Sequence, residues 1–250
     1  MLKKFSLWLI LMFFALPNMA QSIDKSNPGR YMNTSNDFTG GFFWHPRGLG
    51  MSFKSSKKIH DQTWRVINFD LISMRHEKER RIRSSSFSAP GSFFFGKLNY
   101  VYFLRMNYGR RWDLGQHLYK NTLATRVGFS VGPTLAFLKP VYLEIYHPGP
   151  DQASGYLVSE RYNPAVHNDP SIIFGTSPIT KGLLQTKLRA GLSAKAYIEF
   201  DWSDYYDQIQ SLEFGIAIDA FGRNIPILAF AQNKNVFTSL YICLNIGNRW

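Results

Sequence analysis

The C-terminal stretch, residues 236–250, has the sequence VFTSLYICLNIGNRW and alternates strictly between apolar and mixed residues. Every second residue from Val236 to Trp250 is apolar except Thr238 and Asn248, whereas the intervening positions hold Phe, Ser, Tyr, Cys, Asn, Gly and Arg. A period of two residues predicts a β-strand with unlike faces. The apolar stripe reaches Trp250, the last residue, so we expect a strand whose apolar face has apolar surroundings over its whole length.

The same alternation recurs along the chain. Residues 188–202, LRAGLSAKAYIEFDW, place Leu, Ala, Ile, Phe and Trp on one face and charged, small or tyrosine residues on the other. This run is far longer than the roughly 5–6 residues of an ordinary strand. The pattern predicts eight strands, although ten remain possible, at about 39–55, 62–76, 96–113, 122–138, 182–202, 209–221, 224–232 and 235–250.

Charged residues decide between a soluble β-sandwich and a membrane barrel. A sandwich also alternates, but its strands are shorter and its apolar face points inward. Here charges occupy the middle of long strands, which suits apolar residues facing lipid around a polar lumen. We therefore predict an all-β fold, a transmembrane antiparallel up-and-down β-barrel. Its lumen charge network is expected to contain Arg105, Arg126, Lys187, Arg189, Lys195, Glu199, Glu213 and Asp219.

Composition and the N-terminus agree with an exported membrane protein. Aromatic residues make up 16% of the chain, as is typical of barrels with aromatic girdles, and the net charge of +12 suits anionic lipids. Lys3 and Lys4, a short apolar run and Ala20 form the pattern of a secretory signal peptide. We predict a signal peptide at 1–20 and one barrel domain at 21–250. The chain shows no groove-reading motif, so nucleic acid is not an expected partner.

These features resemble those of small outer-membrane β-barrel proteins of Gram-negative bacteria, as a class and without a specific family. The resemblance implies location in the cell outer membrane, among lipids that include lipopolysaccharide. It also implies that the assembly machinery recognises the terminal strand, and that the C-terminus lies in the periplasm. The expected C-terminal assembly signal consists of Leu240, Ile242, Leu244, Ile246 and Trp250.

Two long connections, 77–95 and 139–181, are the expected places of function. With the strands above, both would lie on the periplasmic side, which inverts the usual pattern of short periplasmic turns and long outer loops. Arginine and tyrosine often anchor interfaces, and prolines stiffen the second segment. The candidate residues for binding a partner or an anion are Arg75, Arg80, Arg81, Arg83, Tyr142, Tyr146, Tyr156 and Tyr162.

Catalytic and metal chemistry find little support. Residues 128–132, GFSVG, match G-x-S-x-G, but this serine motif requires a sharp strand-to-helix turn and here lies within a predicted strand. The histidines form no close ligand pair, and the single cysteine, Cys243, is expected to be inert packing. No cofactor is expected. The favoured hypothesis is a non-enzymatic accessory or structural subunit of an envelope complex for assembly, secretion or uptake. The alternatives are a lipid-modifying enzyme and a small channel or ligand-binding barrel.

Overall fold

The computed structural model describes residues 35–84, 91–115, 123–149, 155–203 and 207–250. Within these ranges eight antiparallel strands close into a barrel, as predicted. The predicted signal peptide at 1–20 lies outside the described residues. The barrel strands are β1 (Asn36–His45), β2 (Gly48–His60), β3 (Thr63–Met74), β6 (Asn99–Gly115), β7 (Ala124–Pro140), β11 (Lys187–Asp201), β12 (Gln208–Phe221) and β13 (Val236–Arg249).

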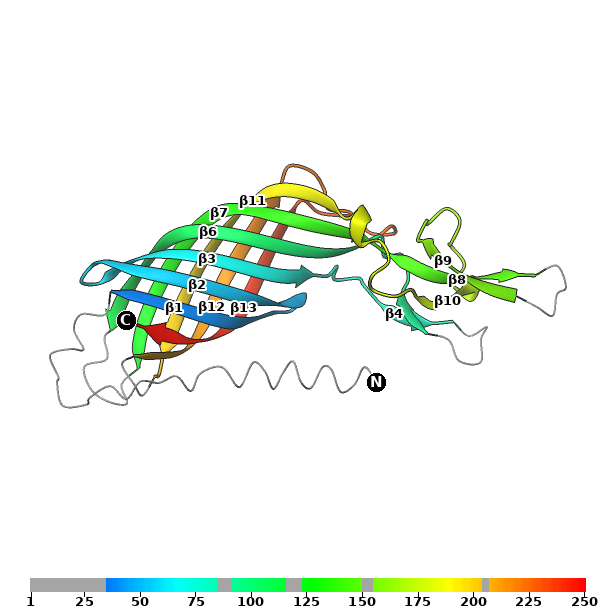
Figure 1. Ribbon diagram of the computed structural model, residues 1–250. Coiled ribbons are helices and arrows are strands. Elements are labelled where there is room, and N and C mark those ends of the chain that lie inside the picture. Colours follow the sequence, from blue (N-terminus) through cyan, green and yellow to red (C-terminus); the bar gives the residue numbers. More distant parts are fainter. Residues whose placement is uncertain (1–34, 85–90, 116–122, 150–154, 204–206) are drawn as a thin grey trace. The chain divides into compact units, whose positions relative to one another are not determined.

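Each barrel strand pairs with its neighbours in the sequence of barrel strands, and β13 closes the ring against β1. Phe42 lies opposite Leu244 and Asp37 lies opposite Arg249 in this closing pair. Figure 1 shows the strands of the wall side by side and inclined. The topology is therefore up-and-down, and the ladder of the barrel has no free edge.

Alternation along the strands separates two environments. Phe42, Phe69 and Leu240 point away from the barrel and are about half exposed, at 54%, 46% and 65%. Their neighbours in sequence, such as Phe43, Asp70 and Tyr241, point inward and are buried. An apolar exterior around an interior that contains charged side chains is the arrangement of a transmembrane barrel. No helix in the described part of the chain is long and apolar enough to span a membrane.

The predicted strand at 39–55 is wrong, because it is a hairpin. Strand β1 ends at His45 and β2 begins at Gly48, and the turn between them contains Pro46, which has no amide hydrogen for the ladder. A Cβ atom on Gly48 would lie 2.1 Å from the Ser73 carbonyl oxygen, so the first residue after the turn must be small where it lies close to β3. The parity of the outward residues also changes here, from even in β1 to odd in β2.

The predicted strand at 224–232 is also wrong. This segment forms only an isolated bridge, between Lys97 and Leu228, and its apolar side chains plug the barrel. Ile225, Ile227 and Leu228 are 0%, 1% and 6% exposed and pack in one cluster with inward residues such as Phe103. Ile225, Ile227 and Leu228 are apolar without strict alternation because all three are buried in the barrel, and Pro226 is unsuited to a central strand.

These two errors cancel in the strand count but reverse the ends. The end that carries both termini has the connections 61–62, 116–123 and 202–207. The opposite end has the turn at 46–47 and the connections 75–98, 141–186 and 222–235. The resemblance implies that the termini lie in the periplasm, and it then implies the outer side for the long connections, as is usual in such barrels. The periplasmic assignment of 77–95 and 139–181 is therefore corrected.

The long connections are not irregular loops, because their described residues form two small sheets. The sheets consist of β4 (Arg81–Arg83) with β5 (Ser92–Phe94), and of β8 (Tyr142–Pro148) between β9 (Gly155–Arg161) and β10 (Ile173–Thr176). We call them together the rim module. Phe93, Leu143 and Ile145 share a hydrophobic cluster of its own. Strand β8 follows β7 after a single residue, Val141, which ties the module to the barrel wall.

The facing of β13 gives a stability prediction. Leu244 points outward near the middle of the strand, so Leu244→Arg is expected to lower the free energy of unfolding in lipid vesicles by about 2–4 kcal/mol. Asn248→Arg, on the same face near the end of the strand, is the matched control and is expected to cost at most about 1 kcal/mol. Denaturant titration followed by tryptophan fluorescence measures both. Equal effects would show that this face does not meet the lipid interior.

Candidate functional site

The lumen contains a network of buried ion pairs. At its centre the Lys54 ammonium on β2 donates to Glu199 of β11 at 2.9 Å and to Glu213 of β12. Lys195 lies 3.0 Å from Glu213 and 3.3 Å from Asp70 of β3. All five side chains are at most 1% exposed. Inward parity on four strands therefore brings together groups that are far apart in sequence.

Further pairs extend the network along the lumen. Arg105 binds Asp219 through two bonds of 2.8 and 2.6 Å, with both side chains fully buried. Nearer the termini, Arg111 donates to Asp37 at 2.6 Å. Arg126 donates to Asp201 at 2.7 Å, and Asp201 also accepts from Arg249. Because a buried charge is costly without a partner, this pairing is what lets charged side chains fill the lumen.

The two halves of the interior differ in chemistry. The half next to the rim module is apolar and contains Phe43, Phe103 and Phe237 beneath the plug at 225–228. Most of the ion pairs lie in the half towards the termini, whereas the Arg105–Asp219 pair lies beside Phe43 and Phe237. Tyr241 joins the two, because its ring stacks on Phe43 at 4.3 Å between centroids and its hydroxyl donates to Glu213 at 2.6 Å. An eight-stranded barrel is just wide enough for such a packed interior.

Six of the eight residues expected in the lumen charge network lie in the lumen. Arg105, Arg126, Lys195, Glu199, Glu213 and Asp219 are buried and paired in the lumen. Lys187 and Arg189 are wrong, because they lie at the start of β11 at the outer rim and are not buried. Inward parity on the correctly divided β1, β2 and β3 would have added several of the missed members. These are Asp37, Lys54 and Asp70; the other missed members, Arg111, Asp113, Asp201 and Arg249, lie on β6, β11 and β13.

The arginine candidates lie on the connection after β3, and two of them, Arg81 and Arg83, belong to β4 of the rim module. Arg75, Arg80, Arg81 and Arg83 are all exposed, and no carboxylate among the described residues pairs with them. The guanidinium of Arg81 lies 5.8 Å from the centre of the Phe94 ring. The neighbouring Glu79 is already engaged, because it accepts from the buried Lys97 at 2.5 Å. The segment thus presents four guanidinium groups that form no ion pair with a described carboxylate.

The tyrosine candidates divide into surface and core. Tyr156 on β9 is 59% exposed and stacks on His147 at 5.7 Å between ring centres. Tyr142 and Tyr146 are half-buried. Tyr162 is only 4% exposed and belongs to the core of the rim module, so its predicted place on a docking surface is wrong. The order of residues alone does not separate these rings, because the cluster that buries Tyr162 also contains Phe93 from the other connection.

A carboxylate between two histidines fastens β8 to the segment after β9. Glu160 accepts from His147 at 2.7 Å and lies 3.1 Å from the His167 ring nitrogen. The hydrogen bond from His147, followed by that from His167, lowers the pKa of Glu160 below its ordinary value of 4.5. Deprotonated Glu160 therefore stabilises the module above that pH.

The serine motif, the histidines and the cysteine named above have structural surroundings. Ser130 of the G-x-S-x-G match lies in the middle of β7, buried and inward, and not at a strand-to-helix turn. Within the described ranges, no group of three or more His, Cys, Asp or Glu side chains is placed to hold a metal ion. Cys243 is 1% exposed and its thiol donates to Asn245 at 3.3 Å, as suits inert packing.

The residues of the expected assembly signal share the outer face of β13. Leu240, Leu244, Ile246 and Trp250 are exposed there, and Ile242 is half-buried on the same side. The backbone carbonyl of Trp250 accepts from Ser35 and Asn36, so the last residue completes the closing pair.

No protein-family model matches the chain, and no curated protein matches it. Solved structures similar to it include Neisserial surface protein A, at 10% identity and a TM-score of 0.36, covering 86% of this chain and 94% of that one. The attachment invasion locus protein Ail of Yersinia pestis is 7% identical with a TM-score of 0.36, covering 86% of this chain and 95% of that one. The outer membrane protein OprG of Pseudomonas aeruginosa is 8% identical with a TM-score of 0.41, covering 88% and 98%.

These neighbours are of the class that the sequence resembles, small outer-membrane barrels. Because the identities and TM-scores are low, the likeness carries no argument about activity, ligand or partner.

The Arg105–Asp219 pair gives the second prediction. Arg105→Met leaves the Asp219 carboxylate buried without its partner and is expected to cost about 3–5 kcal/mol of unfolding free energy. Arg105→Met combined with Asp219→Asn removes that stranded charge and is expected to recover most of the loss. Denaturant titration of the refolded barrel in vesicles measures the coupling. Additive losses would mean that the two groups stabilise the lumen independently.

The Glu160 clamp gives the third prediction. Its folded pKa is lowered, so its stabilisation is complete above the ordinary value of 4.5 and is lost as pH falls through the folded pKa. The protection factors of the β9 amides, which correct for the intrinsic exchange rate at each pH, are expected to fall in that acid range, whereas those of the barrel strands stay high. Glu160→Gln is expected to exchange faster at neutral pH and to lose the acid dependence. An unchanged acid profile in this variant would assign the effect to another group.

Proposed function

We propose that this chain is a non-enzymatic, non-conducting outer-membrane barrel that holds the rim module at the outer surface as a docking site. In this role it is an accessory subunit of an envelope complex, and the barrel is its anchor. The observation that carries the proposal is the contrast between a filled lumen and a folded, positively charged module at the end opposite the termini.

The exterior of the barrel supports the membrane location. Trp112 and Tyr102 face outward on β6 ten residues apart, which at about 3.3 Å per residue and a tilt of about 40° spans about 25 Å. This distance matches the height of the apolar band between the two aromatic girdles of outer-membrane barrels. The outward residues between them are Leu104, Met106, Tyr108 and one charged residue, Arg110.

The interior argues against the channel alternative. The plug at 225–228 packs against inward Phe103 in one half, and buried ion pairs such as Lys54–Glu199 occupy the other. Transport through this lumen would require both the plug and the ion-pair network to rearrange. For the lipid-modifying alternative, no described group combines a nucleophile with a base and an orienting partner, which such chemistry requires.

The rim module supports docking of an acidic partner. Four unpaired arginines lie on one connection and the exposed Tyr156 on the other, and arginine and tyrosine dominate interface anchors. The module has its own core, so its surface is ordered before binding and less conformational entropy is lost on docking.

One cross-linking experiment tests side and partner together. In a Cys243→Ser background, a membrane-impermeant maleimide with a photo-reactive arm is attached to Tyr156→Cys on intact cells. We expect labelling and, after illumination, an adduct of higher mass. Arg80→Ser, Arg81→Ser and Arg83→Ser in combination are expected to remove the adduct and leave the labelling. The adduct is lost because the arginines no longer pair with acidic groups of the partner. Raised salt should also reduce the adduct, because it screens these charges.

Gln62→Cys is the matched control, because Gln62 is exposed at the end that carries the termini. It is expected to react only after the outer membrane is broken. Labelling of Gln62→Cys but not Tyr156→Cys on intact cells would overturn the orientation. Labelling of Tyr156→Cys without any arginine-dependent adduct would overturn the docking role.

A further inference from the structure

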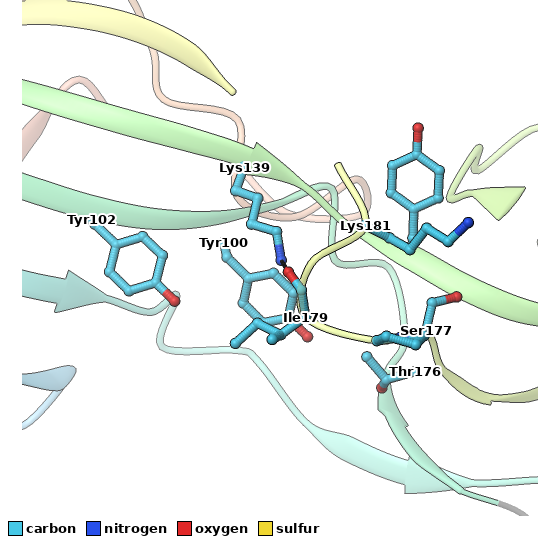
Figure 2. A pocket seen from close by; sticks show the side chains of 9 residues that line it. Tyr100, Tyr102, Lys139, Thr176, Ser177, Ile179 and Lys181 are labelled. Carbon is cyan, nitrogen blue, oxygen red and sulfur yellow. Dashed lines mark hydrogen bonds between the residues drawn. The ribbon is translucent and has the colours of Figure 1, made fainter. Parts of the chain in front are cut away.

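A cavity of about 180 Å³ lies where the barrel wall meets the rim module. Figure 2 shows Tyr100, Tyr102 and Lys139 on the side of the barrel strands and Thr176, Ser177, Ile179 and Lys181 on the facing segment. At about 30 Å³ per water molecule, the cavity has room for about six waters, or for a group the size of a phosphate. Tyr102 faces outward, away from the lumen, so the cavity opens on the outer wall.

Lys139 is a buried cation without a carboxylate partner. Its side chain is only 7% exposed, and its ammonium donates to the backbone carbonyl of Ile179. No Asp or Glu among the described residues lies within ion-pair distance of it. Two lysines lie over the Tyr100 ring, Lys97 at 4.4 Å and Lys139 at 5.6 Å from the ring centre. They differ in their ion pairing, because Lys97 is paired with Glu79 and Lys139 has no described carboxylate partner.

A second unpartnered group lies in the wall of the same cavity. The Ser177 hydroxyl is buried and has no hydrogen-bond partner within the part of the chain that the structure describes. Buried polar groups in folded proteins are nearly always satisfied, by protein, water or a ligand. A positive charge and a free hydroxyl donor in one small cavity are the groups that an anion with several oxygens would satisfy.

The segment over the cavity is held in place. The amide of Ser177 donates to the Tyr142 carbonyl at 3.1 Å, and the Tyr142 hydroxyl donates to Gln185 at 2.8 Å. Gly182 has a φ of 79°, and a Cβ there would lie 2.8 Å from the Tyr142 ring. The cavity is therefore built from ordered backbone on both sides.

The surroundings indicate the source of the anion. Tyr102, at the outer girdle, lines the cavity, and Leu183, Leu184 and Leu188 nearby along the chain are 53%, 103% and 59% exposed. Tyrosine, basic residues and exposed leucines together are the features of a lipid headgroup boundary, where phosphates meet acyl chains.

We propose that this cavity binds the phosphate of an outer-leaflet glycolipid, with Lys139 as its charge partner and Ser177 as a hydrogen-bond donor. The site rests on the membrane location in the proposed function but not on the docking role. The lipid chains would lie along the exposed leucines, and the phosphate would replace the solvent that otherwise satisfies Ser177. Lys181 adds positive charge around the entrance.

Native mass spectrometry of the full chain in detergent micelles tests the proposal with three probes: bisphosphorylated lipid A, the same lipid without phosphates, and inorganic phosphate. We expect retention of the phosphorylated lipid, weakened about tenfold or more by Lys139→Gln and restored towards wild type by Lys139→Arg. Ser177→Ala is expected to weaken retention by a smaller factor without changing barrel stability. Lys57→Gln, an exposed lysine near the other end of the barrel, is the matched control and should have no effect.

Three outcomes would overturn the proposal. Equal retention of the lipid without phosphates would make the site merely apolar. Displacement of the lipid by inorganic phosphate would make it a site for a free anion. Reduced barrel stability in Lys139→Gln, with lipid retention unchanged in both this variant and Ser177→Ala, would make Lys139 a structural clamp on Ile179. None of these bears on the cross-linker at Tyr156, so failure of the lipid site and failure of docking are distinguishable.

Discussion

The pairing of β13 with β1 is the interaction on which the rest of the structure depends. In the hydrocarbon interior an unpaired amide or carbonyl has no water to bind, so a sheet is stable there only when it closes. The register from Asp37–Arg249 to Trp44–Ile242 satisfies the last edge, and the carbonyl of Trp250 continues it by accepting from Ser35 and Asn36. Closure also fixes which side chains face lipid, because one face of every strand then points outward. The alternate residues of β13 that face outward are therefore apolar because the ladder of this strand lies in the hydrocarbon interior.

Closure with eight strands in turn dictates the interior. The lumen is too narrow for an open pore and too wide to leave empty, so inward side chains must fill it. The chain meets this requirement in two ways. Towards the rim module, an apolar segment without alternation, 225–228, folds inward and packs against aromatic rings. Towards the termini, lysines and arginines pair with carboxylates across the lumen. Glu213, for example, has three partners: it accepts from Lys54 and from Tyr241, and it lies 3.0 Å from Lys195.

Strands and the facing of their residues could be predicted from the sequence, because both follow from the local two-residue period. Features that depend on contacts between distant parts of the chain could not. Long alternating strands such as β11 and β13 were predicted closely, because each residue's face follows from its parity. The hairpin at Pro46 and Arg47 was missed although the change of outward parity between Trp44 and Leu49 marks it. A short apolar run fits a buried strand as well as a buried segment without a ladder, so the pattern predicts a strand where the structure has the plug. Partners such as Lys54 for Glu199, 145 residues apart, follow only from the barrel order. The unpaired state of Lys139 depends on the rim module, whose two small sheets have no strong periodic signal.

The corrected hairpin changes the functional argument more than the fold. Moving one turn to 46–47 and removing one strand at 224–232 leaves eight strands, yet it transfers every long connection to the end opposite the termini. The plug, the exposed arginines, Tyr156 and the cavity at Lys139 then all belong to one end. At the other end, the described turn at 61–62 is short and the ion pairs seal the lumen. A barrel with a filled lumen and a folded module at one rim presents its exposed side chains at that rim, where the proposed docking surface and the proposed lipid site both lie.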